Sequence, residues 1–125
     1  MPPVIHLTLW TTDIPALSRF LEAVAGLTVV GIYPGFAELA AGASRVALHS
    51  DEAGRGHPWF TAVQKEGVAR GIGTEIGFSV HDVEAAFRTA TKLGGLAIAP
   101  PYDVDGRREC TVMGPDGYLF TLSQQ

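Results

Sequence analysis

The sequence predicts an α+β fold that contains two tandem βαβββ units, and three observations carry this prediction. Each half of the chain begins with an alternating strand pattern followed by an amphipathic helical pattern. Shorter β-like segments follow each helix. The two halves also align with each other at a shift of 69 positions, which pairs Asp13 with Asp82, Ala16 with Ala85, Arg19 with Arg88, Gly26 with Gly95 and Leu27 with Leu96.

The first half shows the signals of one such unit. Residues 4–10 alternate between apolar and more polar side chains, as in a half-buried strand. Asp13 is a suitable N-cap for the helix that follows, Pro15 fits its first turn, and Gly26 can end it in the left-handed conformation. The apolar stripe of this helix consists of Ile14, Leu17, Leu21 and Val24. Strands are expected at 28–32, 36–40 and 45–49.

The second half repeats this pattern after a connector. A strand is expected at 74–80, an N-cap at Asp82 and a helix end at Gly94 and Gly95, with an apolar stripe of Val83, Ala86, Phe87, Ala90 and Leu93. Further strands are expected at 96–99, 109–113 and 118–122, and the connector at 51–73 is expected to hold a short helix at 59–66. The 125 residues suffice for one domain, with its units at 1–50 and 74–125.

Composition and charge exclude several classes of partner. The net charge is −4, and the longest basic run is Arg107-Arg108, so the sequence offers no basic stripe for nucleic acid. No apolar segment approaches the ~20 residues that span a bilayer, and the N-terminal segment lacks the charged region of a secretory signal. The single cysteine, Cys110, excludes an internal disulfide and a thiolate zinc cluster. A cytoplasmic protein without nucleic-acid or membrane partners is therefore expected.

Two stretches of the sequence carry a resemblance to a known family. The pattern Asp13…Phe20-Leu21…Gly26-Leu27, with Gly-Pro-Asp-Gly-Tyr-Leu-Phe at 114–120, resembles the vicinal oxygen chelate superfamily. This superfamily includes glyoxalase I, bleomycin-binding resistance proteins and extradiol dioxygenases, and the resemblance covers nearly all of the chain outside the connector. It implies a glyoxalase-like fold, in which the two units form a curved mixed sheet around a cleft, commonly in a homodimer. The motifs identify a fold and do not select a reaction.

The resemblance also implies candidate metal ligands. Metal-using members hold a divalent ion (Mn, Fe, Ni, Zn or Mg) with side chains from the first and last strands of the units, and the matching first-strand residues here are His6 and Glu75. The last strands offer Thr121 and Ala47 at the matching places, where a carboxylate is expected. Because such a site needs about three protein ligands, the sequence predicts a degenerate metal site. Glu75, if enclosed and unpaired, is also the candidate general base.

Other residues are candidates for contact with a ligand. Trp10 is placed to stack on a planar molecule, and Arg45 to meet a carboxylate or phosphate. His49 lies on the same strand face as Arg45, and Thr121 takes the place of a ligand. Trp59 and Phe60 in the connector are candidates for a lid or a dimer contact, and Tyr102 for a loop over the cavity. Three further residues, His57, His81 and Cys110, are interpreted as structural.

Three functions are compatible with these residues. The leading interpretation is a small-molecule-binding protein of the glyoxalase/bleomycin-resistance type, with its ligand in the cleft and no intact metal site. The alternative is a metal-dependent lyase, isomerase or dioxygenase that uses His6 and Glu75. The third is a non-catalytic paralogue that only assembles with itself or another protein. A homodimer is expected in either of the first two cases.

Overall fold

The computed structural model describes the chain apart from residues 1–4, 67–69 and 125. The first unit consists of β1 (Leu7–Thr11), α1 (Ile14–Ala25), β2 (Thr28–Tyr33), β3 (Phe36–Ala41) and β4 (Ser44–Ser50). The second unit consists of β5 (Ile76–Ser79), α2 (Val83–Lys92), β6 (Leu96–Val104), β7 (Arg107–Met113) and β8 (Leu119–Gln124). The prediction of an α+β fold with two βαβββ units is thus confirmed.

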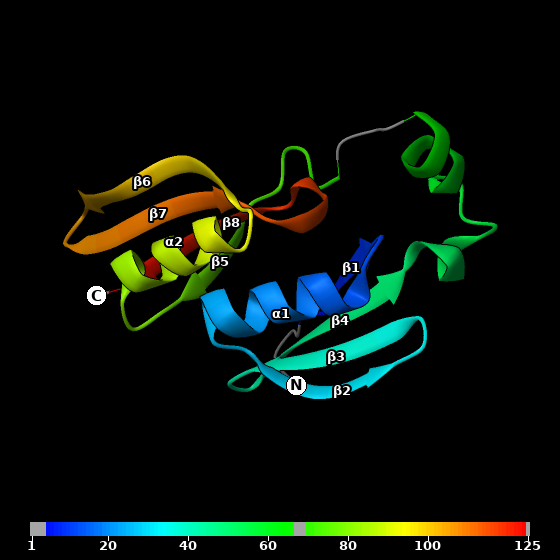
Figure 1. The fold of residues 1–125 in the computed structure, drawn as a ribbon, viewed down its shortest axis with the longest axis horizontal. Coiled ribbons are helices and arrows are strands. Elements are labelled where there is room, and N and C mark those ends of the chain that lie inside the picture. The colour runs from blue at the N-terminus through cyan, green and yellow to red at the C-terminus, as the bar shows by residue number, and fades with distance from the viewer. Residues whose placement is uncertain (1–4, 67–69, 125) are drawn as a thin grey trace.

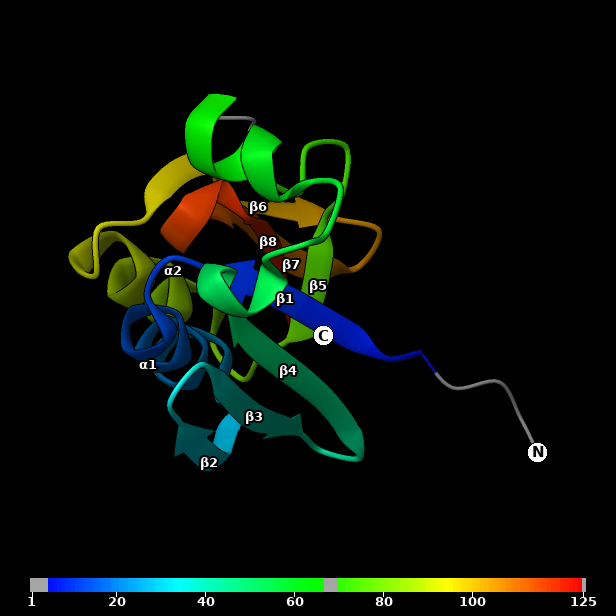
Figure 2. The ribbon, with the colours of Figure 1, turned by 90° about the vertical axis from the view of Figure 1, so that its right-hand side faces the viewer.

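Each unit forms its own four-stranded mixed sheet, with the strand orders β1-β4-β3-β2 and β5-β8-β7-β6. The first strand of each unit is parallel to the last, so that Leu7 is opposite Val46 and Ile76 is opposite Phe120. β1 and β5 are therefore equivalent edge strands. They are the edges at which the two sheets face each other (Figures 1 and 2), and we call the boundary between β1 and β5 the seam.

The helices begin and end where the capping residues predict. The Asp13 carboxylate accepts a hydrogen bond from Ala16 N at 3.0 Å, and the Asp82 carboxylate accepts one from Ala85 N at 3.1 Å. Gly26 ends α1 with a φ of 75°. α1 and α2 lie side by side and cover the same side of the two sheets (Figures 1 and 2). Within the described residues, no helix combines the length and the apolar character needed to cross a bilayer.

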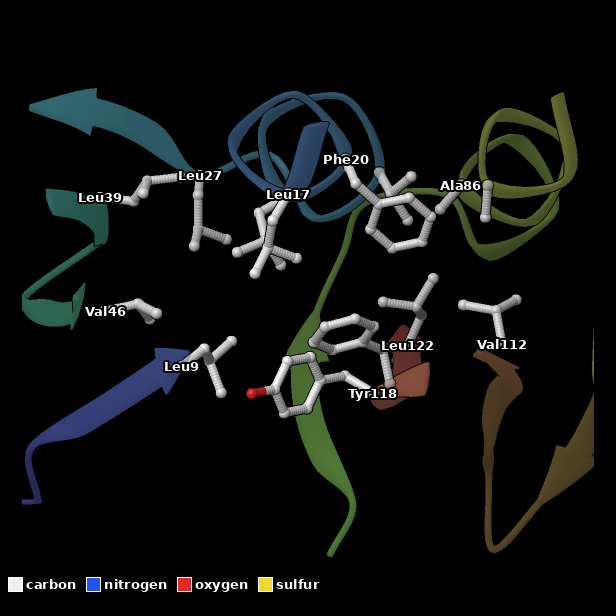
Figure 3. Close-up of a cluster of buried hydrophobic side chains, with 14 of the residues drawn as sticks. Leu9, Leu17, Phe20, Leu27, Leu39, Val46, Ala86, Val112, Tyr118 and Leu122 are labelled. Carbon is white, nitrogen blue, oxygen red and sulfur yellow. The ribbon is translucent and has the colours of Figure 1, made fainter. Parts of the chain in front are cut away.

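One apolar core lies between the helices and the sheets and extends across both units (Figure 3). Leu17 of α1 and Leu122 of β8 are both fully buried. The rings of Phe20 in α1 and Phe120 in β8 have their centroids 5.7 Å apart, so the first unit's helix packs directly on the second unit's sheet. Side chains alternate along a strand, and those that do not point into this core lie on the opposite side of the sheets, which we call the open face.

Several strand boundaries differ from the sequence prediction, most clearly those of β6, β1 and β5. β6 continues to Val104 through Pro100 and Pro101, although prolines argue against a strand. β6 tolerates them because it is an edge strand, and its register with β7 is irregular on either side of Ala99. β1 begins only at Leu7 and β5 only at Ile76, so that His6 and Glu75 each directly precede a strand. Residue 4, the predicted strand start, lies outside the described residues.

Candidate functional site

A continuous group of rings lies on the open face of the first unit, and we call it the aromatic array. It consists of Trp10, Tyr33, Phe36, His49, His57, Trp59 and Phe60. The centroids of the Trp10 and His49 rings are 4.9 Å apart. Phe36 continues the array from His49, at 5.1 Å, and Tyr33 lies 6.1 Å beyond Phe36. These separations fall within the ~4.5–7 Å over which aromatic rings attract each other.

Strand register explains why three of these rings meet. Trp10 of β1 is directly opposite His49 of β4, and His49 is directly opposite Phe36 of β3. Their neighbours Leu48 and Ala37 are fully buried in the core, so all three rings lie on the open face. Directly opposed side chains on neighbouring strands are close enough to interact. Strand pairing alone therefore brings the rings of Trp10, His49 and Phe36 together.

The connector supplies the other rings. The Trp59 and His57 rings lie 4.9 Å and 5.3 Å from the Trp10 ring, and Phe60 lies 6.4 Å from Trp59. The guanidinium of Arg55 covers Phe60 at 5.4 Å. Gly54 makes this approach possible, because a Cβ at this position would lie 2.5 Å from the ring of Trp59. Glycine at position 54 therefore permits the ring of Trp59 to pack against the backbone there.

A buried polar network fixes the connector to β1 and to the second unit. Asp51, only 4% exposed, accepts hydrogen bonds from both terminal nitrogens of Arg70 and, at 2.7 Å, from Gln64 Nε2. Arg70 Nη1 also donates to the carbonyl of Trp10 at 2.8 Å, and the Tyr118 hydroxyl donates to the same carbonyl at 2.6 Å. The hydrogen bond with Asp51 raises the pKa of Arg70, and burial raises the pKa of Tyr118. Arg70 therefore stays charged and Tyr118 neutral around Trp10.

The second unit presents small and polar side chains near the seam instead of rings. Glu75 is exposed and accepts a hydrogen bond from the Thr121 hydroxyl, which lies 3.5 Å from that of Thr111. Thr121 is therefore the partner of Glu75. Its register equivalent in the first unit is Ala47, which has no polar side chain. His6 is exposed at the start of β1.

A groove of about 820 Å3 opens at the other end of the seam. Its walls come from the C-terminal end of α1, the beginning of β1, β5 and the first turns of α2. Ile5 and Leu7 line it on one side, and residues 76–82 line it on the other. Trp10, at the far end of β1, does not belong to this lining. The groove and the aromatic array therefore occupy different ends of β1.

The predicted ligand-binding residues are brought together only in part. Four of them, Trp10, His49, Trp59 and Phe60, lie in the aromatic array. Arg45 is exposed beside the groove and donates to two backbone carbonyls. Tyr102 lies in strand β6, opposite Glu109, and not in a loop.

Sequence reasoning missed three members of the array. Phe36 alternates with the core residues Ala37 and Leu39, a signal that places it on the open face. Tyr33 occupies the end of the neighbouring strand, opposite Phe36. His57, interpreted as structural, lies in a glycine-rich connector without periodicity, where no sequence signal indicates its contact with Trp10.

The described residues do not fit a divalent metal site. Among them, no group of three or more His, Cys, Asp or Glu side chains is arranged to hold an ion. Of the implied ligand positions, Ala47 offers no donor atom, and Thr121 uses its hydroxyl to donate to Glu75. Cys110 is fully buried, and burial raises the pKa of its thiol to about 11, so it is protonated at neutral pH.

Comparison with known proteins identifies what the chain is similar to. The sequence model of the Glyoxalase/Bleomycin resistance protein/Dioxygenase superfamily matches residues 4–122. A glyoxalase/bleomycin resistance protein/dioxygenase family enzyme from Burkholderia phytofirmans is 22% identical, with a TM-score of 0.75 and 95% of each chain covered. A glyoxalase-related enzyme from Fulvimarina pelagi is 17% identical, with a TM-score of 0.76 over 100% of this chain and 89% of the other. A protein of unknown function from Agrobacterium tumefaciens is 21% identical, with a TM-score of 0.76 over 100% of this chain and 95% of the other. No curated protein matches the sequence.

Proposed function

Because the chain belongs to the glyoxalase/bleomycin resistance protein/dioxygenase superfamily, we propose that it is a small-molecule-binding protein whose ligand is a planar, partly aromatic compound. The fold is shared by proteins with unrelated activities, so the argument rests on the site. The observation that carries the proposal is the aromatic array around Trp10.

The array has the properties of a stacking surface. Trp10 and Trp59 are half-buried, and Tyr33 is 59% exposed, so part of their ring surface remains free for a ligand. The rings are also held in place before any ligand arrives, because Arg70 and Tyr118 fix the backbone at Trp10. Such preorganisation lowers the entropic cost of binding. A ligand ring that stacks here gains about 0.5–1.5 kcal/mol for each aromatic partner beyond the burial of its area.

Binding in this proposal is independent of a divalent metal. Members of the superfamily often bind such ions, and a tight site needs about three protein ligands. The implied positions in this chain supply His6 and Glu75, and Glu75 already accepts a hydrogen bond from Thr121. The binding energy is therefore assigned to the rings and not to an ion.

Isothermal titration calorimetry with 2-naphthol tests this function, with the saturated decahydro-2-naphthol as the matched non-aromatic probe. We expect 2-naphthol to bind more tightly, and excess EDTA to leave its affinity unchanged. Phe36→Leu keeps an apolar side chain but removes a ring of the array, and should weaken binding by about 1 kcal/mol, or about fivefold. Phe87→Leu removes a half-buried ring from α2, outside the array, and is the matched control. Equal affinity for the two probes, or binding that requires a divalent ion, would contradict the proposal.

The proposed assembly is a homodimer formed through the outer edge strands. Large exposed apolar side chains gather on β2 and β6, which are the edges of the sheets farthest from the seam. Apart from Tyr33, which belongs to the aromatic array, they are Val30, Ile32, Leu96, Ile98 and Tyr102. An exposed apolar edge strand is a template for pairing with another chain, and a folded protein usually covers it. A second copy of the chain supplies that cover in this proposal.

A further inference from the structure

The two ends of the seam between β1 and β5 differ, although the repeat makes them equivalent. At one end, Phe20 and Phe120 are in contact. At the same end, the Asp116 carboxylate accepts hydrogen bonds from the Thr11 and Thr12 hydroxyls and from Thr12 N at 3.2 Å. Tyr118 also closes this end by donating to the Trp10 carbonyl. The other end of the seam holds the groove of about 820 Å3.

Strand register shows which residues of the groove correspond to Phe120, Tyr118 and Asp116 at the closed end of the seam. Val46 is opposite Leu7 as Phe120 is opposite Ile76, so Val46 is the equivalent of Phe120. Two residues earlier, Ser44 is the equivalent of Tyr118. Four residues earlier, Gly42 is the equivalent of Asp116, and their φ angles of 59° and 61° agree.

A helix position completes the comparison. Thr89 is seven residues after the N-cap Asp82, as Phe20 is seven residues after the N-cap Asp13. The four equivalents of the closing residues, Gly42, Ser44, Val46 and Thr89, all line the groove, and each is smaller than its counterpart. The groove is therefore a specific difference between the repeats and not a general looseness of the seam.

Among the described residues, the lining of the groove combines apolar side chains with the cationic side chain of Arg45. Ile5, Leu7 and Phe78 contribute apolar surface. Arg45 stands at the rim of the groove: its side chain starts on the open face, and its Nη1 reaches the carbonyls of the groove residues Gly42 and Ser44, at 3.3 and 3.2 Å. The described residues include no carboxylate paired with it. The acidic residue in the lining, Asp82, uses its carboxylate to cap α2.

We propose that this groove is a second ligand site, and that it binds a small apolar carboxylate with its hydrocarbon part between β1 and β5 and its anionic group on Arg45. The volume lies within the ~300–1,000 Å3 of ligand sites. A guanidinium pairs with a carboxylate in a charge-assisted contact, which supplies the complementarity. The site lies at the opposite end of β1 from the aromatic array and does not depend on it.

Titration calorimetry with octanoate, and with 1-octanol as the neutral probe of the same chain length, tests this site. Octanoate should bind more tightly than octanol. Arg45→Gln should weaken octanoate about fivefold and leave octanol unchanged. Arg88→Gln removes an exposed arginine of α2 outside the lining and should alter neither affinity. Equal affinities for octanoate and octanol, or no response to Arg45→Gln, would overturn the proposal.

A second variant fills the groove by replacing two of its lining residues with the larger residues found at the equivalent positions of the closed end, Tyr118 and Phe20. Ser44→Tyr combined with Thr89→Phe should abolish binding of both probes, while 2-naphthol binding at the array persists and reports an intact fold. The absence of a 2-naphthol response in the unaltered protein would refute the aromatic site and leave the octanoate result unaffected. Octanoate binding that survives the filled groove would overturn the second site. Sedimentation velocity should give the same oligomeric state for the filled variant and the unaltered protein. A change from dimer to monomer in the filled variant would identify the groove as a subunit interface and would also overturn the proposal of a second ligand site.

Discussion

Replacement of Arg70 by alanine tests whether the buried network holds the connector on the aromatic array. Arg70 Nη1 is 2.7 Å from one Asp51 oxygen and 2.8 Å from the Trp10 carbonyl, and Nη2 donates to the second Asp51 oxygen. Without Arg70, the carboxylate of Asp51 keeps Gln64 as its partner at a position only 4% exposed. Removing one member of a buried ion pair costs about 3–5 kcal/mol. We therefore expect Arg70→Ala to reduce the free energy of unfolding by about 3 kcal/mol.

The consequences should be local as well as global, and fluorescence can follow them. A loss of about 3 kcal/mol shifts the equilibrium between the docked and undocked connector by about 150-fold. The chain has two tryptophans, and both Trp10 and Trp59 belong to the array, so their emission should move to longer wavelength as water reaches them. Urea unfolding gives the loss of stability. Binding of 2-naphthol should weaken in the same variant.

Two further variants make this prediction specific. Arg55→Ala breaks an ion pair with Glu52 in which the side chains are 70% and 65% exposed, also removes the guanidinium over the Phe60 ring, and should cost only about 1 kcal/mol. Arg70→Lys keeps the positive charge but cannot donate to both oxygens of Asp51 in the same way, and should fall between the two. If Arg70→Ala and Arg55→Ala had the same effect, or if the tryptophan emission did not change, the assignment of the network to the connector would be wrong.

Three other features lead to direct measurements. Cys110 is fully buried, and its pKa is raised to about 11, so iodoacetamide should react with it at pH 8 far more slowly in the folded protein than in urea. The pKa of Cys110 is higher in the folded than in the unfolded protein, so the folded state favours the protonated thiol. The free energy of unfolding should therefore fall as the pH rises towards 11. Gly54→Ala places a Cβ against Trp59 and should shift the tryptophan emission, whereas an unchanged spectrum would contradict the close approach. Ile32→Lys and Ile98→Lys, both on exposed outer strands, should each convert the proposed dimer to a monomer in sedimentation, and a dimer that survives both changes would place the interface elsewhere.

Local signals made the fold predictable from the sequence. The caps Asp13 and Asp82 act within three residues of themselves, and alternation and helical periodicity are equally local. The end of β6 was missed because Pro100 and Pro101 are unfavourable in a strand, and only the position of β6 at the sheet edge makes them acceptable. The end of β6 therefore depends on the strand order of the sheet, which a local sequence pattern does not contain.

The candidate site was predictable where strand alternation determines it and unpredictable where the connector contributes. Trp10 and His49 follow from their positions on strands, whereas the contact of His57 with Trp10 depends on how residues 51–66 return to β1. His6 and Glu75 are expected as metal ligands only because the resemblance implies ligands at those positions. In this chain Glu75 is bonded to Thr121, and the rings gather at the other end of β1 from His6.

The two repeats have diverged most where they do not support the core. By register, Trp10 is equivalent to Ser79, His49 to Ser123 and Phe36 to Glu109, so that each of these three rings corresponds to a small or polar side chain in the second unit, whereas Tyr33 corresponds to Tyr102. Their buried neighbours Leu48 and Ala37 correspond to Leu122 and Cys110, which are buried and apolar as well. Core packing constrains both copies alike, because either sheet loses stability when its buried face changes. The open face carries no such constraint, so Trp10, His49 and Phe36 are free to differ from their counterparts, and the proposal assigns ligand contact to the first unit while Tyr118 of the second unit donates a hydrogen bond to the Trp10 carbonyl.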